Sequence, residues 1–475
     1  MKYFNNEFQV LSEQELYRVH SLTLELLEKK GLLFHSEEAV KILAAHGAKA
    51  DGNCVRFPAP LVEKCIAQSP ANFLWQARDD KKSLMIGHEQ NKVYSMQDNG
   101  PVFIQERNGQ KRMGNFEDVC NFYKLGQTSK VTTIVGQCTV DPHELDDAPN
   151  KHKIITQKLL ELTDKPIISW PQMSNQNTKD VFDMVEMVMG TGYLDRNYFI
   201  TASVCALSPL QYSQESADTI IAYAKANQPV MLLTCPISGV SAPIGEIPSL
   251  ILQNAEILAG LVLAQCVRPG IPVIYGISHN MGDLRTGTFV TSSPEAKLVD
   301  RASIQLVQML YHIPTRFMAG NTDSKLPDIQ AGFETMQNYI FLLMGGSQMI
   351  NECLGILDGM MTVSYEKYII DEELLERIQI MMSGLDISEE AFDISELLEL
   401  PHAESFLMCE STLKKCGKQW LPATSEWNSY DMWEANGSPD ILDKAAKICA
   451  ERLESAPEDL LGEDLKKSLT AFAQK

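Results

Sequence analysis

The sequence predicts an α/β fold, a (β/α)₈ TIM barrel that carries an N-terminal α+β extension and a C-terminal helical segment. From about residue 116 onward, short β-branched or aromatic runs alternate with longer segments of helical periodicity. Several runs directly follow a proline, which suits the start of a strand and not its middle: Pro166, Pro229, Pro272 and Pro314. We therefore expect an extension over residues 1–115, a barrel over 116–415 and a helical segment over 416–475.

The extension begins with two predicted helices. Ser12 and Glu15 have the spacing of a capping box, and apolar residues then recur at helical intervals as far as Gly31. A second helix is expected over Ser36–Ala45. The remaining part of the extension holds short β-like runs at Asn53–Phe57, Val93–Met96 and Pro101–Gln105. This pattern predicts a mixed helical and β cap in front of the barrel.

Eight runs are candidates for the barrel strands. They are Val131–Val135, Ile167–Trp170, Phe199–Cys205, Val230–Cys235, Val273–Tyr275, Thr315–Met318, Gln348–Asn351 and Ser405–Cys409. Helices are expected between most of them, including Val181–Met189, Ser213–Ala226, Ile251–Gln265 and Pro294–Tyr311. Eight strands separated by helices favour a closed barrel over an open sheet.

In such a barrel, chemistry takes place where the strands end and the βα loops begin. The predicted strand ends carry Gln137, Trp170, Gln172, Cys205, Cys235, Ser238, residues 275–280, Asn321, Glu352 and Glu410. Carboxylates, amides and aromatics outnumber nucleophiles and bases here, as expected for a site that binds a polar or cationic small molecule. His279 follows a predicted strand, and a functional role and a structural role are equally open for it. The sequence nominates no catalytic residue.

Composition excludes several classes of protein. With 62 Asp+Glu against 41 Lys+Arg, the formal net charge is −21, which argues against a nucleic-acid partner. The sequence shows no signal peptide, and we expect no membrane association and a cytoplasmic location. The 11 cysteines form no CxxC pair and the 9 histidines no HExxH motif, so no disulfide framework and no metal site are expected. Glycine-rich phosphate loops are absent as well.

Two C-terminal features have alternative interpretations. Residues 371–399 contain ten carboxylates and one arginine, which favours a solvated helical surface, the alternative being a docking rim for a partner. Trp420, Trp427, Tyr430 and Trp433 lie close together in the sequence. Packing against the barrel is favoured for them over contact with a ligand, although such side chains also stabilise quaternary ammonium groups.

Several stretches together resemble the trimethylamine methyltransferase (MttB-like) family. They are Ser241–Gly245, Asn254–Gly260, Pro269–Gly276, Asp283–Gly287, Asn321–Glu334 and Ser364–Lys367, with looser agreement at Gly100–Phe103 and Lys165-Pro166. The resemblance implies a TIM barrel that moves a methyl group from a methylamine to the Co(I) of a corrinoid on a separate protein. All residues are standard, so the chain resembles the branch without pyrrolysine, whose members demethylate quaternary amines such as glycine betaine, proline betaine and carnitine. Ser405 and Ser411 stand where family members often have histidine, so the exact substrate does not follow from the resemblance.

Given the substrate class that the resemblance implies, the predicted strand ends nominate residues at the barrel mouth that would bind it. A methyl group on quaternary nitrogen departs to leave a neutral amine, so orientation and desolvation suffice for its transfer to Co(I). The expected substrate-binding residues are donors for a betaine carboxylate and groups that attract its cation: Arg285, His279, Asn280, Asn321, Glu352, Glu410 and Tyr275. The motif residues Asp283, Asp323, Ser324, Lys325, Asp328 and Glu334 either serve the site or only form a helix-capping network.

We expect the corrinoid to belong to the partner and no cofactor to be held by this chain. Residues 141–146, with the sequence DPHELD, miss the DxHxxG cobalt-ligating pattern because Asp146 replaces the glycine. The expected partners are therefore a small quaternary amine, a cognate corrinoid protein and further copies of the chain in a homo-oligomer. Two alternatives remain: a quaternary-amine sensor without turnover, and a methylcorrinoid:tetrahydrofolate methyltransferase.

Overall fold

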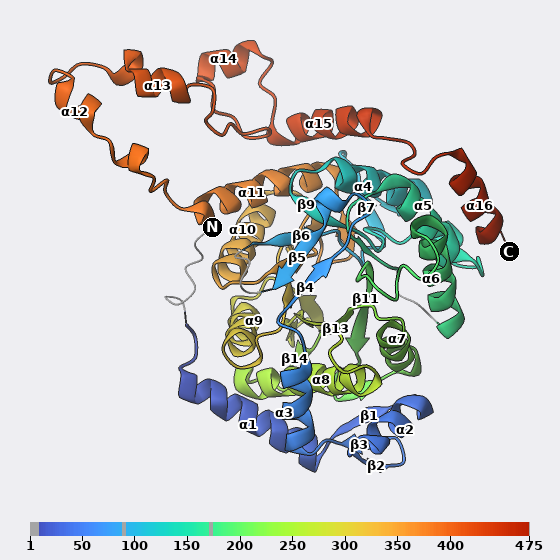
Figure 1. Cartoon of the computed structure of the whole chain (residues 1–475). Helices are drawn as coiled ribbons and strands as arrows, with labels where there is room; N and C mark the ends of the chain where they lie inside the picture. The colour runs from blue at the N-terminus through green and yellow to red at the C-terminus, as the bar shows by residue number, and fades with distance from the viewer. Residues whose placement is uncertain (1–8, 88–91, 171–173, 475) are drawn as a thin grey trace.

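The computed structural model describes residues 9–87, 92–170 and 174–474. Its centre is a closed barrel of eight parallel strands with the order β10-β11-β13-β15-β18-β19-β6-β9 (Figure 1). The strands are β6 (Tyr94–Met96), β9 (Thr132–Gly136), β10 (Ile167–Ile168), β11 (Ile200–Ala206), β13 (Val230–Thr234), β15 (Val273–Ile277), β18 (Thr315–Met318) and β19 (Met349–Asn351). The predicted TIM barrel is confirmed, and its first seven predicted strands coincide with β9 to β19.

The eighth predicted strand is wrong. Residues 405–409 lie outside the barrel, where Phe406–Met408 forms a 3₁₀ turn, η6, with exposed side chains. The barrel is closed by β6 instead, whose Tyr94 and Ser95 pair with Met349 and Ile350 of β19. The barrel therefore takes one strand from the segment predicted as the N-terminal extension.

A ring of eight helices surrounds the strands. They are α4 (Phe116–Thr128), α5 (Lys151–Leu162), α6 (Asn175–Met189), α7 (Gln214–Lys225), α8 (Glu246–Val267), α9 (Pro294–Leu306, extended by the π-helical turn η4, Val307–Tyr311), α10 (Ile329–Met344) and α11 (Tyr365–Ser383). By length and composition, α8 is the one described helix that could cross a membrane, but 89% of its apolar window is buried. It packs between α7 and α9 and is covered by the N-terminal helices, as a core helix is.

The N-terminal extension supplies that cover. It contains α1 (Glu13–Lys29), β1 (Leu32–Phe34), α2 (Glu37–Ala45), β2 (Lys49–Asp51), β3 (Cys54–Arg56) and α3 (Ala59–Gln68). The predicted capping box forms, because Ser12 and Glu15 bond each other's backbone amides at the start of α1. Helices α1, α2 and α3 all pack on α8, and β1 pairs with β12 (Gln211–Tyr212) from a βα loop of the barrel. The extension thus buries the outward face of the apolar helix α8.

A hairpin closes the end of the barrel at which the strands begin. It is formed by β4 (Asn72–Trp75) and β5 (Leu84–Gly87), with the 3₁₀ turn η1 (Asp80–Lys82) between them. Phe73, Trp75 and Ile86 are buried in one cluster with inward-facing strand residues such as Ile274 and Met349. The Trp75 indole N–H donates to the Phe199 carbonyl oxygen at 3.0 Å. The interior is therefore a packed core at this end, and open space is confined to the other end.

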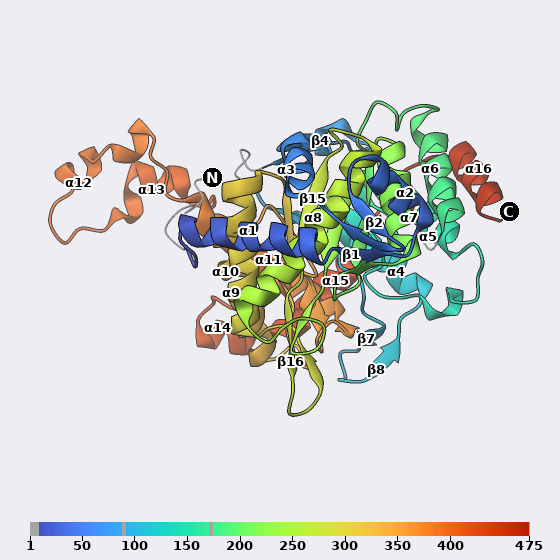
Figure 2. The same ribbon diagram turned by 90° about the horizontal axis from the view of Figure 1, so that it is seen from below.

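The βα loops at the opposite end carry small sheets of their own. One contains β7 (Phe103–Gln105), β8 (Lys111–Met113), β20 (Ile356–Leu357) and β21 (Thr362–Val363), and another contains β14 (Ile237–Ser238), β16 (Asn280–Asp283) and β17 (Thr288–Val290). The 3₁₀ turn η3 (His143–Leu145) follows β9. In Figure 2 these loops project together beyond one end of the barrel, which we call the mouth.

The C-terminal part first leaves the barrel and then returns to it. Its elements are η5 (Glu389–Phe392), α12 (Ser395–Glu399), η6, α13 (Glu410–Lys415), α14 (Tyr430–Ala435), α15 (Ile441–Ser455) and α16 (Glu463–Ala473). Helix α15 packs on α4 and α11, and α16 packs on α5 and α6. Trp420 and Trp427 pack against each other and against the Arg377 guanidinium of α11.

Candidate functional site

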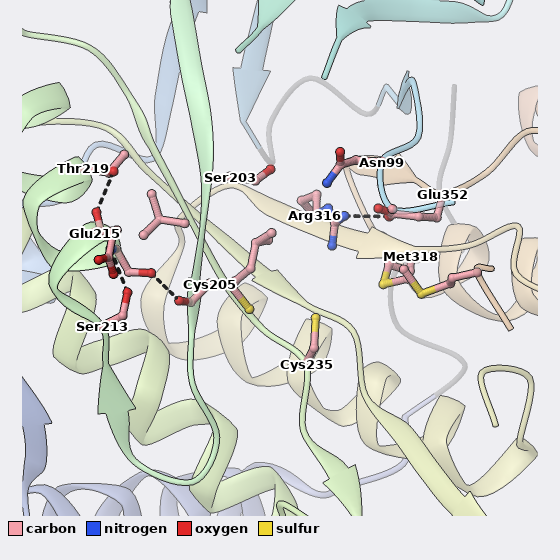
Figure 3. Close-up of a pocket in the computed structure, with 15 residues that line it drawn as sticks. Asn99, Ser203, Cys205, Ser213, Glu215, Thr219, Cys235, Arg316, Met318 and Glu352 are labelled. Carbon is pink, nitrogen blue, oxygen red and sulfur yellow. Dashed lines mark hydrogen bonds and ion pairs between the residues drawn. The ribbon is translucent and has the colours of Figure 1, made fainter. Parts of the chain in front are cut away.

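A cavity of about 440 Å³ lies at the mouth, where five barrel strands end (Figure 3). The residues that line it are Asn99, Gly100, Ser203, Val204, Cys205, Ser213, Glu215, Ser216, Thr219, Leu233, Cys235, Arg316, Met318, Glu352 and Met360. Cavities of this size accommodate small-molecule ligands, and in barrels of this kind substrates bind at the carboxyl ends of the strands. Strand ends of β11, β13 and β18 and the segments after β6 and β19 bring these side chains together.

An ion pair stands at one side of the cavity. Arg316 Nη2 donates to Glu352 Oε2 at 2.7 Å, and both side chains are almost fully buried (Figure 3). Burial raises the pKa of Glu352 to about 7, although Arg316 acts in the opposite direction. The carboxyl group therefore titrates near neutral pH. Asp98, buried beside Glu352, has its pKa raised well above its usual range by burial and by the neighbouring carboxylate.

The Arg316 guanidinium is only partly paired. Its Nε and Nη1 atoms are buried and have no hydrogen-bond partner among the described residues. Other buried polar atoms without a partner also gather near the mouth, including Asp98 Oδ2, Gln137 Oε1 and both amide atoms of Asn321 and Asn351. Buried polar groups in native proteins are almost always satisfied, so such a concentration is typical of a site that a polar ligand or ordered water completes.

Several residues at the mouth have strained backbones, and two of them directly follow barrel strands. Gln137, after β9, has φ 55°, and Glu352, after β19, has φ 41°. Left-handed conformations cost a non-glycine residue free energy and concentrate at functional sites, because the surroundings must hold them. Gln137 is held through its Nε2, which donates to Ser203 Oγ at 2.6 Å.

The other walls of the cavity are apolar or sulfur-containing. Val204 and Leu233 border it together with Met318 and Met360, and the thiols of Cys205 and Cys235 face it in Figure 3. Glu215, at the start of α7, is exposed and marks the place where the cavity reaches solvent. The site therefore combines the buried cation of Arg316, the buried carboxyl group of Glu352 and a wall of aliphatic and sulfur-containing side chains.

Of the predicted substrate-binding residues, Glu352 lines the cavity. Cys205 and Cys235, which the sequence placed at strand ends, line it as well. Glu410 does not, because the run taken as the eighth strand is not a strand. It begins α13, far along the chain from the barrel strands, and its exposed carboxylate pairs with Lys414. Gln172 lies outside the described residues.

Tyr275 faces away from the mouth. Alternation along β15 turns Ile274 into the barrel and Tyr275 outward, where its hydroxyl donates to Asn254 Oδ1 of α8 at 2.9 Å. The side chain is fully buried between the strand and its helices. The predicted place of Tyr275 across the mouth is wrong, because successive side chains of a strand point to opposite faces and that of Tyr275 points to α8.

His279 and Asn280 are buried next to β15 but do not line the cavity. His279 bonds Ser238 Oγ and Gln253 Oε1, both at 2.9 Å, and burial lowers its pKa to about 3. It is therefore neutral and fully paired. The Asn280 amide donates to Ser278, while its Oδ1 atom has no partner among the described residues.

Arg285 and most motif residues form loop structure. Arg285 is exposed on the β16–β17 hairpin and pairs with Asp283, and Lys325 pairs with Asp358 on the surface. Asp323 accepts hydrogen bonds from the backbone amides of Thr291 and Ser292. Asp328 caps α10 and bonds Ser324, and Glu334 accepts a hydrogen bond from the Asp323 backbone amide. This arrangement is the helix-capping network, the structural interpretation of the motif.

Arg316 is the residue that the sequence interpretation missed. It lies inside the predicted strand Thr315–Met318, and a charged side chain in an otherwise apolar strand was the available signal.

Among the described residues, no group of three or more His, Cys, Asp or Glu side chains could hold a metal ion.

Comparisons with known proteins agree with this architecture. Residues 2–475 match the family described as Trimethylamine methyltransferase (MTTB). The chain is 30% identical over 431 residues to a glycine betaine methyltransferase of Desulfitobacterium hafniense, covering 90% of this chain and 88% of that protein. It is 31% identical over 400 residues to a proline betaine:corrinoid methyltransferase of Eubacterium limosum, covering 82% of this chain and 81% of that protein.

A solved structure supports the fold. The monomethylamine methyltransferase of Methanosarcina barkeri superposes with a TM-score of 0.56 at 12% sequence identity, covering 95% of this chain and 89% of that chain. At this identity the likeness concerns the barrel and its surrounding elements.

Proposed function

Because this chain belongs to the trimethylamine methyltransferase (MTTB) family, we propose that it transfers an N-methyl group from a betaine to the Co(I) of a corrinoid on a separate protein. The chain is a methyltransferase of the corrinoid-dependent type, in line with relatives named as corrinoid methyltransferases. The betaine as methyl donor, and the residues that bind it, are the new parts of the proposal.

The observation that carries the proposal is the pair of opposite charges in one small cavity. A betaine has a carboxylate and a quaternary ammonium only a few bonds apart. Two buried guanidinium nitrogens of Arg316 have no partner within the described part of the chain and suit the carboxylate, and Glu352 beside them suits the cation. A simple tertiary amine would leave the Arg316 nitrogens unpaired, which costs free energy.

The chemistry fits a cavity with this lining. In the transfer, the C–N bond breaks with its electron pair left on nitrogen, a C–Co bond forms, and the products are a neutral tertiary amine and methyl-Co(III). No proton has to move. The protein therefore needs to orient the methyl group and exclude water, which the apolar walls at Leu233, Met318 and Met360 favour.

The acceptor must reach the methyl group through the mouth. The packed β4–β5 hairpin closes the other end of the barrel, and the exposed Glu215 marks the solvent side of the cavity. A corrinoid protein that docks on the βα loops would present cobalt to the cavity from this side.

An anaerobic assay tests the proposal. The protein is mixed with reduced cobalamin and with glycine betaine, proline betaine, carnitine, trimethylamine or choline, and methylcobalamin formation is followed by absorbance. Choline is the matched probe, since it carries the same trimethylammonium group without a carboxylate. We expect a betaine to be the best donor. Equal turnover of choline or trimethylamine would contradict the zwitterion site.

The same experiment separates the alternatives from the proposal. Saturable binding of a betaine without any methyl transfer would indicate a sensor. Methyl transfer from methylcobalamin to tetrahydrofolate, with no reaction of any quaternary amine, would indicate the folate enzyme.

A further inference from the structure

Residues 384–419, here called the arm, leave the barrel and extend into solvent. In Figures 1 and 2, α12 and α13 of this segment lie well away from the helical ring. The chain meets the barrel again at Trp420, whose indole N–H donates to Glu376 of α11 at 2.8 Å. Within the arm, Ser411 bonds Glu396, so its two limbs contact each other.

The arm is rich in exposed apolar side chains. Leu385 is 90% exposed, Met408 78% and Leu398 75%. Ile387, Phe392, Ile394, Leu397, Phe406, Leu407 and Leu413 are exposed too. Together they present roughly 1,000 Å² of apolar surface, compared with about 800 Å² buried per partner in a standard interface. The arm therefore exposes about as much apolar surface as one partner of a standard interface buries.

A second apolar surface lies on α10, which begins at the mouth after β18 and runs toward the end of the barrel from which the arm leaves. On α10, Ile329 is 87% exposed, Phe333 58% and Ile340 38%, and their spacing puts them on one side of the helix. Helix α10 packs against α11, which carries the arm at its end. Met381, near the end of α11, is exposed as well.

The position of the arm argues against the corrinoid protein as its partner. Helix α11 follows β19 and runs back toward the end of the barrel where the strands begin. The arm starts directly after α11, so it starts at the end opposite the mouth. A lipid surface is also disfavoured, because the arm contains eight carboxylates and three lysines.

We propose that the arm packs on the α10 face of a second copy of this chain, in a two-fold dimer in which each subunit receives the other's arm. One chain presents both an apolar arm and an apolar helix face, which is the self-complementarity that an isologous interface requires. Both surfaces are outside the cavity, so the proposal is independent of the methyl donor.

Sedimentation velocity of the full chain over a range of micromolar concentrations tests this proposal. We expect a dimer for the wild type. Leu398→Asp in the arm and Phe333→Asp on α10 should each weaken self-association at least about tenfold. Leu284→Asp, at a comparably exposed leucine on the β16–β17 hairpin at the mouth, is the matched control and should leave the dimer intact.

Mixing the two variants gives the sharper result. Leu398→Asp retains a normal α10 face and Phe333→Asp a normal arm, so the mixture should regain one of the two contacts and dimerise more strongly than either variant alone. If one variant loses its cooperative melting transition, Leu407→Asp or Ile329→Asp replaces it. A monomeric wild type, a dimer that persists in both variants, or a mixture no stronger than its components would overturn the proposal.

Discussion

Arg316 and Glu352 are an ion pair in a place where neither group is well hydrated. Removing two charges from water is expensive, and one hydrogen bond of 2.7 Å offsets only part of that cost. The remaining polar atoms of Arg316 have no partner among the described residues. A zwitterionic ligand would satisfy the cation and the carboxylate together, which is why two substitutions at this pair are the most direct tests of the proposed site.

Arg316→Gln should raise the KM for the best betaine by about 10–100-fold, since a hydrogen bond to a charged group contributes about 1.5–3 kcal/mol. Reaction with choline, which has no carboxylate, should change little. Arg285→Gln is the matched control, because Arg285 is exposed and pairs only within its own hairpin. Initial rates of cob(I)alamin methylation measure all three. A KM for the betaine that is the same in both variants would contradict carboxylate binding by Arg316.

Glu352 should make betaine binding depend on pH. With its pKa raised to about 7, the carboxyl group is mostly protonated below that pH and ionised above it. The ionised form attracts the ammonium group, so KM should fall as the pH rises from about 6 to about 8. Glu352→Gln should raise KM at the higher pH and remove the pH dependence.

A structural role for Glu352 predicts a different outcome. If it only pairs with Arg316, Glu352→Gln should lower the melting temperature and leave KM and its pH profile as in the wild type. Kinetics and thermal unfolding on one preparation decide between the two roles.

At this scale, strand-end positions could be predicted and side-chain directions could not. Glu352 and the two thiols at Cys205 and Cys235 were found from strand ends alone. Tyr275 is predicted to face the mouth, but its side chain points outward to α8. Arg316 lies in a run predicted as a buried strand, and its side chain lines the cavity. The direction of each side chain depends on barrel register, which only the folded chain defines.

Among the elements, prediction failed for the strand that closes the barrel. The run at Val93–Met96 is predicted as β-like but assigned to the extension, because β7 and β8 follow β6 before the next helix, α4. Residues 405–409 are apolar and resemble a buried strand, yet they belong to the exposed arm. The seven other strands were predictable because each is a buried run next to a helical segment.

The β4–β5 hairpin can be tested as the closure of the barrel. Trp75 is fully buried and stacks near Phe73, so Trp75→Ala should destabilise the protein by about 3–5 kcal/mol through the cavity it leaves. Leu74→Ala is the control on the same strand, since Leu74 points outward and is 38% exposed. Urea unfolding monitored by circular dichroism compares them. Equal losses in the two variants would mean that the hairpin does not seal a core.

At the scale of the whole molecule, the cavity and the arm lie at different ends of the barrel. The hairpin closes one end of the barrel, the mouth opens the cavity at the other end, and the arm extends from the closed side. A partner that delivers Co(I) would then bind at the mouth, and the arm of a second copy would bind along α10, outside the cavity.

The rim of the mouth offers a surface for the corrinoid protein. Exposed apolar residues stand on several of its βα loops, including Val240, Ile244 and Leu284, which are 69%, 60% and 64% exposed. Leu284→Asp should raise the KM for the cognate corrinoid protein by about five- to tenfold, which corresponds to about 1–1.4 kcal/mol at an interface position. The rate with free cob(I)alamin, which needs no protein docking, should stay unchanged. Leu398→Asp in the arm should do the opposite, weakening self-association and sparing the KM for the corrinoid protein. Steady-state methyl transfer with both acceptors measures this, and a loss with free cob(I)alamin equal to the loss with the corrinoid protein would assign Leu284 to the shape of the cavity instead of docking.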